Sequence, residues 1–269
     1  MEAVDKKAGI SKNVIFHEAA SNDCWCRDHG PSFLVNAKGE KAVVDWKFNA
    51  WGGKYPFQLD DKIAKYISKF TGYKRFAPTI VMEGGAVEAN GSGILLTTSS
   101  CLLNPNRNPH LSKTDIETYL KDYYCVESVY WLKDGIVGDD TDGHIDDIAR
   151  FVCRDKLLVA CEEDRSHMNY LPLIENIKRV EQIISEGIIK DFMELPMPKN
   201  KDIEENHLPA SYANYYVCNT GVIVPIFNCM QDKKAIDAIS KASSDRKIIP
   251  LYSGNIIHGL GSWHCLSQQ

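Results

Sequence analysis

Apolar residues recur every three or four positions in four stretches of the chain, a spacing that predicts amphipathic helices. The predicted helices are Asp60–Phe70, Lys113–Tyr123, Leu173–Glu186 and Lys233–Lys241. Ser112 and Asp115 form an N-terminal capping signal for the second helix, and Gly187 is a candidate C-terminal cap for the third. The helices begin at close to one interval, which indicates a repeated structural unit.

Short strand-like runs flank these helices, with two runs before each helix and one after it. Around the first helix they are Ser32–Val35, Ala42–Trp46 and Thr79–Met82. Around the third and fourth helices they are Ile148–Val152, Leu157–Cys161, Phe192–Leu195, Tyr215–Cys218, Val222–Ile226 and Lys247–Leu251. The pattern therefore predicts an α+β fold built from four complete strand–strand–helix–strand units.

A fifth unit is predicted to be divided between the two ends of the chain. Ala3–Ala8 would end its helix, Asn13–His17 would be its last strand and Gly261–Gln269 would supply its first strand. The strand that leads into the helix has no counterpart. We therefore expect either that residues are missing at the N-terminus or that the repeat closes in another way.

Polar clusters follow the units at nearly the same interval as the helices. Asp28 precedes Glu83 by 55 residues, Glu83 precedes His144 by 61, and His144 precedes Cys265 by 121, close to two further steps. Asp146 lies beside His144 in Thr141–Asp146. Since loops at one end of a repeated scaffold commonly carry functional residues, we expect these side chains to form one central site.

Composition is that of an ordinary globular protein, and it argues against nucleic acid and membranes as partners. The 269 residues are 44% hydrophobic and 25% charged, with a net charge of −5, which provides no electrostatic footprint for nucleic acid. The sequence has neither a membrane-spanning run nor a secretory signal pattern, and its nine scattered cysteines suit reduced thiols. We therefore expect a soluble cytoplasmic protein without membrane or nucleic-acid partners.

Each motif taken alone has an ordinary structural interpretation. Glu83-Gly84-Gly85 is compatible with a turn, and a buried Cys265 is more often inert than reactive. His144 and Asp146, if they lie in a strand, project to the same face and could bind a metal or form structural hydrogen bonds. Asp28 could simply stabilise its loop.

Six motifs, in order, together resemble the agmatine deiminase family within the guanidine-modifying superfamily. They are Asn22–Pro31, Glu83–Gly85, Leu102–Pro109, Thr141–Asp146, Leu208–Asn214 and His264–Gln269. The resemblance implies a five-bladed pseudo-symmetric α/β propeller, with residues 1–269 forming a single catalytic domain. Two departures are a shorter N-terminal region than relatives carry and a run, Gly259–Trp263, that is less glycine-rich than theirs.

The resemblance implies hydrolytic deimination of a guanidine, most directly agmatine, through a covalent amidino-cysteine. Cys265 would be the nucleophile and His144 the acid and then the base, with Glu83 tuning His144. Asp28 and Asp146 would bind the guanidinium, whose fork of N–H donors suits two carboxylates. Trp25 would form an apolar wall or cation–π face. No metal or organic cofactor is implied.

Four further residues are expected to support the site without acting in it. Asn104, Arg107 and Asn214 would hold nearby loops. His264 would point away from Cys265, because adjacent residues of a strand face opposite sides.

Three alternatives remain open from the sequence. The chain could be a noncatalytic relative that binds an amine or a partner, or a zinc hydrolase that uses His144, Asp146 and Cys265. It could also act on peptidyl-arginine, because recognition of a guanidinium leaves the rest of the substrate unspecified. A small-molecule guanidine is the expected ligand, and a homodimer is compatible with the resemblance.

Overall fold

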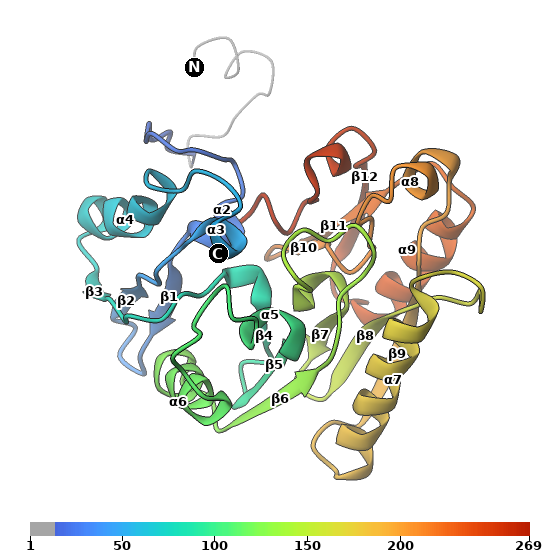
Figure 1. Ribbon diagram of the computed structural model, residues 1–269, viewed down its shortest axis with the longest axis horizontal. Helices are drawn as coiled ribbons and strands as arrows, with labels where there is room; N and C mark the ends of the chain where they lie inside the picture. Colours follow the sequence, from blue (N-terminus) through green and yellow to red (C-terminus); the bar gives the residue numbers. More distant parts are fainter. Residues whose placement is uncertain (1–13) are drawn as a thin grey trace.

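Four three-stranded sheets form the framework of the chain in the computed structural model, which describes residues 14–269. In each sheet the first two strands are antiparallel, and the third strand runs parallel to the second. The four units follow one another around the molecule in sequence order (Figure 1). The described residues therefore have a mixed α/β fold made of repeated units.

Each unit contains one long helix between its second and third strands. The parallel pairing requires such a crossover, because a tight turn can join only antiparallel neighbours. The elements of the first two units are β1 Ser32–Val35, β2 Lys41–Val44, α4 Ile63–Thr71, β3 Lys74–Phe76, β4 Val87–Ala89, β5 Ile94–Thr98, α6 Lys113–Tyr124 and β6 Ser128–Leu132. Those of the last two are β7 Ala149–Cys153, β8 Lys156–Cys161, α7 Tyr170–Ser185, β9 Asp191–Pro196, β10 Tyr216–Val217, β11 Gly221–Ile226, α9 Gln231–Ala242 and β12 Lys247–Tyr252.

All four predicted long helices are confirmed within a few residues of their expected ends. The Ser112–Asp115 capping box is present at the start of α6. Gly187 follows α7 with a φ of 75°, the left-handed conformation that ends helices and that glycine adopts without steric cost. The 3₁₀ turn η1, Asp60–Lys62, supplies the first predicted turn of the helix that continues as α4.

Apolar side chains of the middle strands and of the long helices bury the core. Leu157 and Val159 of β8 pack with Leu173 and Val180 of α7 in the largest cluster of buried residues. The middle strands β5 and β8 are nearly continuous buried runs, as expected for strands covered on both faces. Burial of these strands and helices fixes where the connecting loops emerge.

Three predicted strands differ from the structure. Residues 79–82 form only an isolated bridge from Val81 to Lys47, and β3 lies earlier in the chain. Gly261–Gln269 forms turns and irregular structure rather than a strand. Over the described part of Asn13–His17, residues 14–17, the structure has no strand, and Ala3–Ala8 lies outside the described residues.

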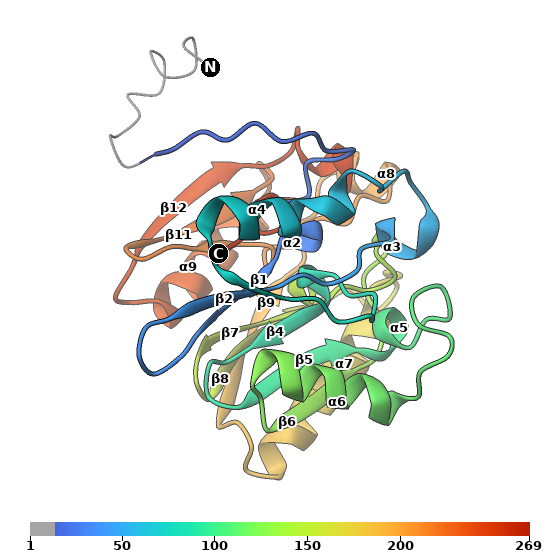
Figure 2. The ribbon, with the colours of Figure 1, turned by 90° about the vertical axis from the view of Figure 1, so that its left-hand side faces the viewer.

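Short helices and 3₁₀ turns occupy the connections between these elements. They are α2 Cys26–His29, α3 Ala50–Gly53, α5 Ser99–Leu102, α8 Lys201–Glu205, η2 Gly84–Ala86, η3 Ile145–Asp147 and η4 Ile257–Gly259. Figure 2 shows α3, α5 and α8 at one end of the molecule, opposite the turn that joins β1 and β2. None of the helices within residues 14–269 combines the length and apolarity needed to cross a membrane.

Candidate active site

The predicted polar residues converge from four segments, one that precedes the first unit and three that follow the first, second and fourth units. His144 lies at the centre: its Nδ1 is 3.7 Å from Asp28 Oδ1 and 4.0 Å from Asp146 Oδ1, and its Nε2 is 3.9 Å from Glu83 Oε2. Cys265 Sγ lies 3.7 Å from Asp146 Oδ2. The structure therefore brings together Asp28, Glu83, His144, Asp146 and Cys265.

His144 and Asp146 approach each other through a 3₁₀ turn and not through the strand considered in the sequence. His144 directly precedes η3, and Asp146 lies within it. Burial alone would lower the pKa of His144, but the charge of Asp28 and the contacts to Cys101 and Glu83 raise it well above its usual range. The imidazole is therefore held in its cationic form among carboxylates.

Asp28 is fixed by two donors from other segments. Trp51 Nε1 donates to Asp28 Oδ2 over 3.0 Å, and the backbone N–H of Gly85 donates to Oδ1 over 2.9 Å. A Cβ atom at Gly85 would lie 2.6 Å from His144 Nδ1 and 2.8 Å from Asp28 Oδ1, too close for any side chain. The glycine after Glu83-Gly84 thus lets the backbone reach the centre of the site.

Asn214 joins Cys265 to a neighbouring pair of carboxylates. Its Nδ2 donates to Cys265 Sγ over 3.0 Å and to Asp147 Oδ1 over 3.0 Å, while its Oδ1 accepts from the backbone N–H groups of His264 and Cys265. Asn214 follows the third unit, within the long interval between His144 and Cys265. The expected supporting place of Asn214 near the site is confirmed.

His264 faces the site, and the prediction that it points away is wrong. Its Nδ1 is hydrogen-bonded to Asp146 Oδ2 at 2.7 Å, the same oxygen that Cys265 Sγ approaches. The segment is a turn, so the alternation of a strand does not apply to it. Burial and the positive charges of Arg150 and Arg27 lower the pKa of His264, which keeps this imidazole neutral.

Two acidic groups of the site favour their protonated forms. Burial, followed by the charges of Asp146, Asp147 and Asp28, raises the pKa of Cys265 well above that of an ordinary thiol. Burial likewise raises the pKa of Asp146 to about 7, against the opposing charge of His144. Cys265 is therefore held as a thiol, and a cation placed between these residues would favour the thiolate.

Arg107 holds Glu83 and the loop that carries His144. Its Nε donates to Glu83 Oε1 over 2.9 Å, its Nη1 contacts Asp142, and its Nη2 donates to the carbonyl of Thr141 over 2.9 Å. Burial would raise the pKa of Glu83, but Arg107 and His144 together outweigh burial and lower that pKa. Asn104 accepts from the backbone N–H of Arg107 through its carbonyl, so both residues support loops as expected.

A cavity of about 230 Å³ opens onto Cys265 and Asp28. Trp25 and Trp51 line it with apolar surface, and Asp23 and Asp140 add carboxylates. Trp25 is buried against Gly261, where a Cβ atom would lie 2.5 Å from the indole. The cavity therefore combines aromatic walls with negative charge and leads to the sulfur.

Comparison with known proteins identifies the family. The family model of the Porphyromonas-type peptidyl-arginine deiminases matches residues 1–269. The chain belongs to this family. It is 34% identical over 283 residues to an agmatine deiminase of Ectopseudomonas mendocina, an alignment that covers 96% of this chain and 77% of the relative.

Solved structures of this deiminase family have the same architecture. The C. jejuni agmatine deiminase with substrate bound is 35% identical and has a TM-score of 0.91, covering 100% of this chain and 79% of the other. An Enterococcus faecalis agmatine deiminase, described as catalysing its reaction, is 33% identical with a TM-score of 0.91, covering 98% and 79%. The mixed α/β arrangement is thus that of the deiminase family.

Sequence reasoning missed several residues that contact the site of this family member, among them Trp51 and Asp147. Trp51 binds Asp28 and lies in α3, where both Trp51 and Gly52 have positive φ values of 54° and 96°. The Trp-Gly-Gly sequence could have indicated this unusual turn. Asp147 is buried beside Asp146, and its burial and the charge of Asp146 raise its pKa. The only sign of Asp147 in the sequence is that it directly follows Asp146.

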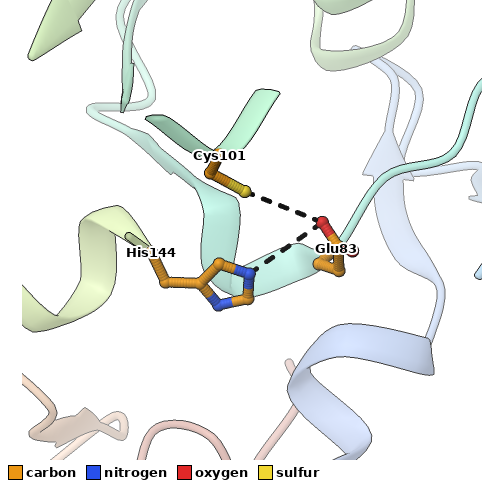
Figure 3. A group of neighbouring side chains, drawn as sticks. All are labelled: Glu83, Cys101 and His144. Carbon is orange, nitrogen blue, oxygen red and sulfur yellow. Dashed lines mark hydrogen bonds and ion pairs between the residues drawn. The ribbon is translucent and has the colours of Figure 1, made fainter. Parts of the chain in front are cut away.

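One group of side chains among residues 14–269 gathers potential metal ligands in one place. It comprises Glu83, Cys101 and His144, whose ligand atoms all lie within 4.8 Å of one another (Figure 3). The set considered in the sequence, His144 with Asp146 and Cys265, does not form such a group within the described chain. Cys101 comes from α5 and was not identified as a candidate.

Proposed function

We propose that this chain hydrolyses the guanidine of agmatine to give N-carbamoylputrescine and ammonia. The observation that carries the proposal is the convergence of Asp28, Asp146 and His144 with Cys265, of which Asp28 and Cys265 also line an aromatic and acidic cavity. The agmatine deiminases to which the chain is similar support the same reaction class.

Substrate binding would use the two carboxylates that flank His144. A guanidinium is a planar cation with several N–H donors, so Asp28 and Asp146 can each accept from its terminal nitrogens. Trp51 and the Gly85 backbone already fix Asp28, which limits the reorganisation that binding requires. Trp25 would cover the apolar methylene chain or face the cation.

Nucleophilic attack would begin when the bound cation favours ionisation of Cys265, whose proton passes to solvent. The thiolate forms a bond to the guanidinium carbon, and protonated His144 donates its proton to the departing nitrogen. The C–N bond breaks and ammonia leaves, so that the carbon remains bonded to sulfur as an amidino-cysteine. Glu83, paired with Arg107, would hold His144 in place.

Hydrolysis would then use the same imidazole in the opposite direction. Neutral His144 takes a proton from water as the water oxygen bonds to the carbon. The C–S bond breaks and the hydroxyl proton of the adduct passes to the departing sulfur, which restores the Cys265 thiol and releases the ureido product. One residue therefore serves as acid in the first half-reaction and as base in the second, without a metal or organic cofactor.

Agmatine is favoured over peptidyl-arginine by the charge of the cavity. Agmatine carries a second cation at its amine end, and Asp23 and Asp140 line the same cavity as Cys265. A peptide would instead bring a bulky backbone to that cavity of about 230 Å³. Peptidyl-arginine deimination and noncatalytic amine binding are the alternatives that the experiment must separate.

The decisive experiment is an ammonia-release assay with agmatine, arginine and an arginine peptide. Agmatine should give the highest kcat/KM, and Cys265→Ala should abolish turnover while agmatine binding remains measurable by calorimetry. Cys218→Ser, which changes a cysteine of the β10–β11 turn, is the matched control and should remain active. Binding without turnover in the unmodified protein would favour the noncatalytic alternative, and a preference for the peptide would overturn the choice of substrate.

The covalent intermediate has its own test. An acid quench shortly after mixing with agmatine should leave the amidino mass on the peptide that contains Cys265, provided that hydrolysis is not much faster than attack. Mass on another cysteine would show that a different nucleophile reacts.

We also infer that residues 1–269 form one catalytic domain of a five-bladed propeller. The shared strand order of the four sheets and the TM-scores of 0.91 support this arrangement. Contacts between α2 and the C-terminal segment, including Arg27 N–H to the Cys265 carbonyl at 3.1 Å, already join the two ends of the described chain. An experimental structure in which four units alone enclose the centre would contradict the five-bladed arrangement.

The cellular setting follows from composition. We propose a cytoplasmic protein that does not bind nucleic acid, because the net charge is −5 and all nine cysteines are free. The homodimer is proposed from the family resemblance alone. Sedimentation at two protein concentrations, with and without DNA, would detect a monomer or a nucleic-acid complex.

A further inference from the structure

Glu83 divides its two carboxylate oxygens between different neighbours. Oε1 accepts from Arg107 Nε over 2.9 Å, whereas Oε2 faces Cys101 Sγ at 3.9 Å and His144 Nε2 at 3.9 Å. Figure 3 shows Cys101 and His144 directed toward this carboxylate from different parts of the chain. A sulfur, a nitrogen and an oxygen thus converge on one small volume.

The His144 nitrogen in this cluster is unsatisfied. Both ring nitrogens of His144 lack a hydrogen-bond partner among residues 14–269, although the side chain is buried. Buried polar atoms normally have a partner, so this one requires an explanation. The contact of 3.9 Å to Glu83 is an ion-pair distance and does not satisfy the nitrogen.

We propose that Glu83, Cys101 and His144 bind a thiophilic divalent cation such as Zn²⁺, which inhibits the protein. Thiolate, imidazole and carboxylate are the ligand types that zinc uses in proteins. Tetrahedral zinc with bonds of about 2.0 to 2.3 Å separates its ligand atoms by roughly 3.3 to 3.5 Å. The atoms here lie within 4.8 Å of one another, so no pair of ligand atoms has to approach by more than about 1.5 Å to close the site.

The surroundings favour a metal-bound His144. Its Nδ1 faces Asp28 at 3.7 Å and Asp146 at 4.0 Å, so a carboxylate lies within reach to accept the Nδ1 proton and orient the ring once Nε2 binds a metal. Asp28 and Asp146 offset the charge of Arg107 next to Glu83. On binding, the Cys101 thiol proton and the proton of His144 Nε2 would pass to solvent, because the ligands bind in their deprotonated forms.

Inhibition rests on the proposed function, in which His144 transfers protons. A metal on Nε2 would fix this ring and remove its exchangeable proton from that nitrogen. Glu83, Cys101 and His144 are all buried, so we expect the metal to enter slowly. Inhibition should therefore deepen during preincubation with Zn²⁺ and reverse when a chelator is added.

Cobalt spectroscopy tests the site without reference to activity. Co²⁺ added to chelator-treated protein should produce a thiolate-to-cobalt charge-transfer band with one equivalent bound. The band should persist in Cys265→Ser and in the control Cys218→Ser, and it should be lost in Cys101→Ser. Circular dichroism and thermal unfolding establish that each variant is folded, and His144→Ala, which should also lose the band, provides a second variant if Cys101→Ser is unstable.

The zinc titration tests the inhibitory role. Cys101→Ser should raise the Zn²⁺ concentration for half-inhibition by about tenfold or more, since even indirect partners of a ligand change metal affinity by about 10- to 100-fold. A band that disappears in Cys265→Ser and persists in Cys101→Ser would place the metal on the proposed nucleophile and overturn the inference, as would the absence of any band. If the protein lacks deiminase activity, the proposed function fails while the cobalt spectra still decide the metal site.

Discussion

Asn214 binds Cys265 from two directions, through its side-chain amide to Sγ at 3.0 Å and through its Oδ1 from the Cys265 backbone N–H at 3.3 Å. The two residues are 51 positions apart, so the contact joins the loop after the third unit to the C-terminal turn. The sulfur is thereby held beside Asp146 and at the cavity.

Replacement of Asn214 should therefore impair attack more than binding. We expect Asn214→Ala to lower kcat by about 100-fold, because displacement of a reacting atom by about 1 Å has an effect of that size. Steady-state kinetics with agmatine measures it, with Asn206→Ala on the exposed end of α8 as control. A folded Asn214→Ala variant with unchanged kcat would mean that the turn positions Cys265 unaided.

Trp51 should contribute to substrate binding through Asp28. We expect Trp51→Phe to raise KM about tenfold or more with a smaller change in kcat, because a hydrogen bond to a charged group contributes about 1.5 to 3 kcal/mol. Trp46→Phe is the matched control, since Trp46 donates to Ser32 Oγ at 2.9 Å and packs in the core of the first two units. Equal KM values for the two variants would show that Trp51 does not contribute to substrate binding.

Gly85 should tolerate no side chain. The Cβ atom of Gly85→Ala would displace His144 and Asp28, so we expect loss of detectable activity together with a lower unfolding temperature. Gly39→Ala adds a Cβ that meets no atom within 4 Å and serves as control, although its φ of 78° carries a backbone cost. Activity near that of the unmodified protein in Gly85→Ala would show that the site is wider than its distances indicate.

Ionisation of Asp146 should lower the free energy of unfolding as the pH rises. Its pKa of about 7 in the folded protein exceeds the ordinary value of 3.8, so the folded state binds the extra proton between these values and stability falls across this window. We expect Asp146→Asn to be more stable than the unmodified protein near pH 8, by up to about 4 kcal/mol, and to lose this advantage near pH 4. Urea unfolding at both pH values measures the difference.

The control for this prediction is Asp155, a carboxylate whose pKa is lowered in the folded protein rather than raised. A hydrogen bond from Lys190 lowers the pKa of Asp155, so Asp155→Asn should not gain stability near pH 8. If Asp146→Asn is less stable than the unmodified protein at both pH values, its hydrogen bond with His264 matters more than the burial of its charge. The same variant should bind agmatine weakly.

The repeat could be predicted because helix periodicity and strand order are local properties of the sequence. The assignment of residues 79–82 failed for a tertiary reason. Ile80 and Met82 are fully buried, as their pattern indicates, but the edge of β2 is already paired with Lys74–Phe76. Hydrophobic alternation predicts burial of a segment and does not specify its strand partner.

The sequence indicated the central residues of the candidate site and part of their support, but it missed the contacts of Trp51 and His264. Repeated motif spacing brought Glu83 and Cys265 into one hypothesis, whereas the contacts of Trp51 and His264 depend on how distant loops meet. Trp51 lies 23 residues from Asp28, and His264 lies 118 residues from Asp146. Such pairs have no local periodicity, so the folded chain is needed to find them.

Each unit is followed by a loop that brings different polar groups to the centre, and this distribution makes enzymatic activity a measure of global folding. A partly folded chain in which one unit has detached would retain most of its helices and strands, and circular dichroism would scarcely register the loss. The same chain would lack a proton donor, a carboxylate or the sulfur. During refolding, the return of ammonia release should therefore coincide with docking of the last unit and should lag behind the recovery of secondary structure.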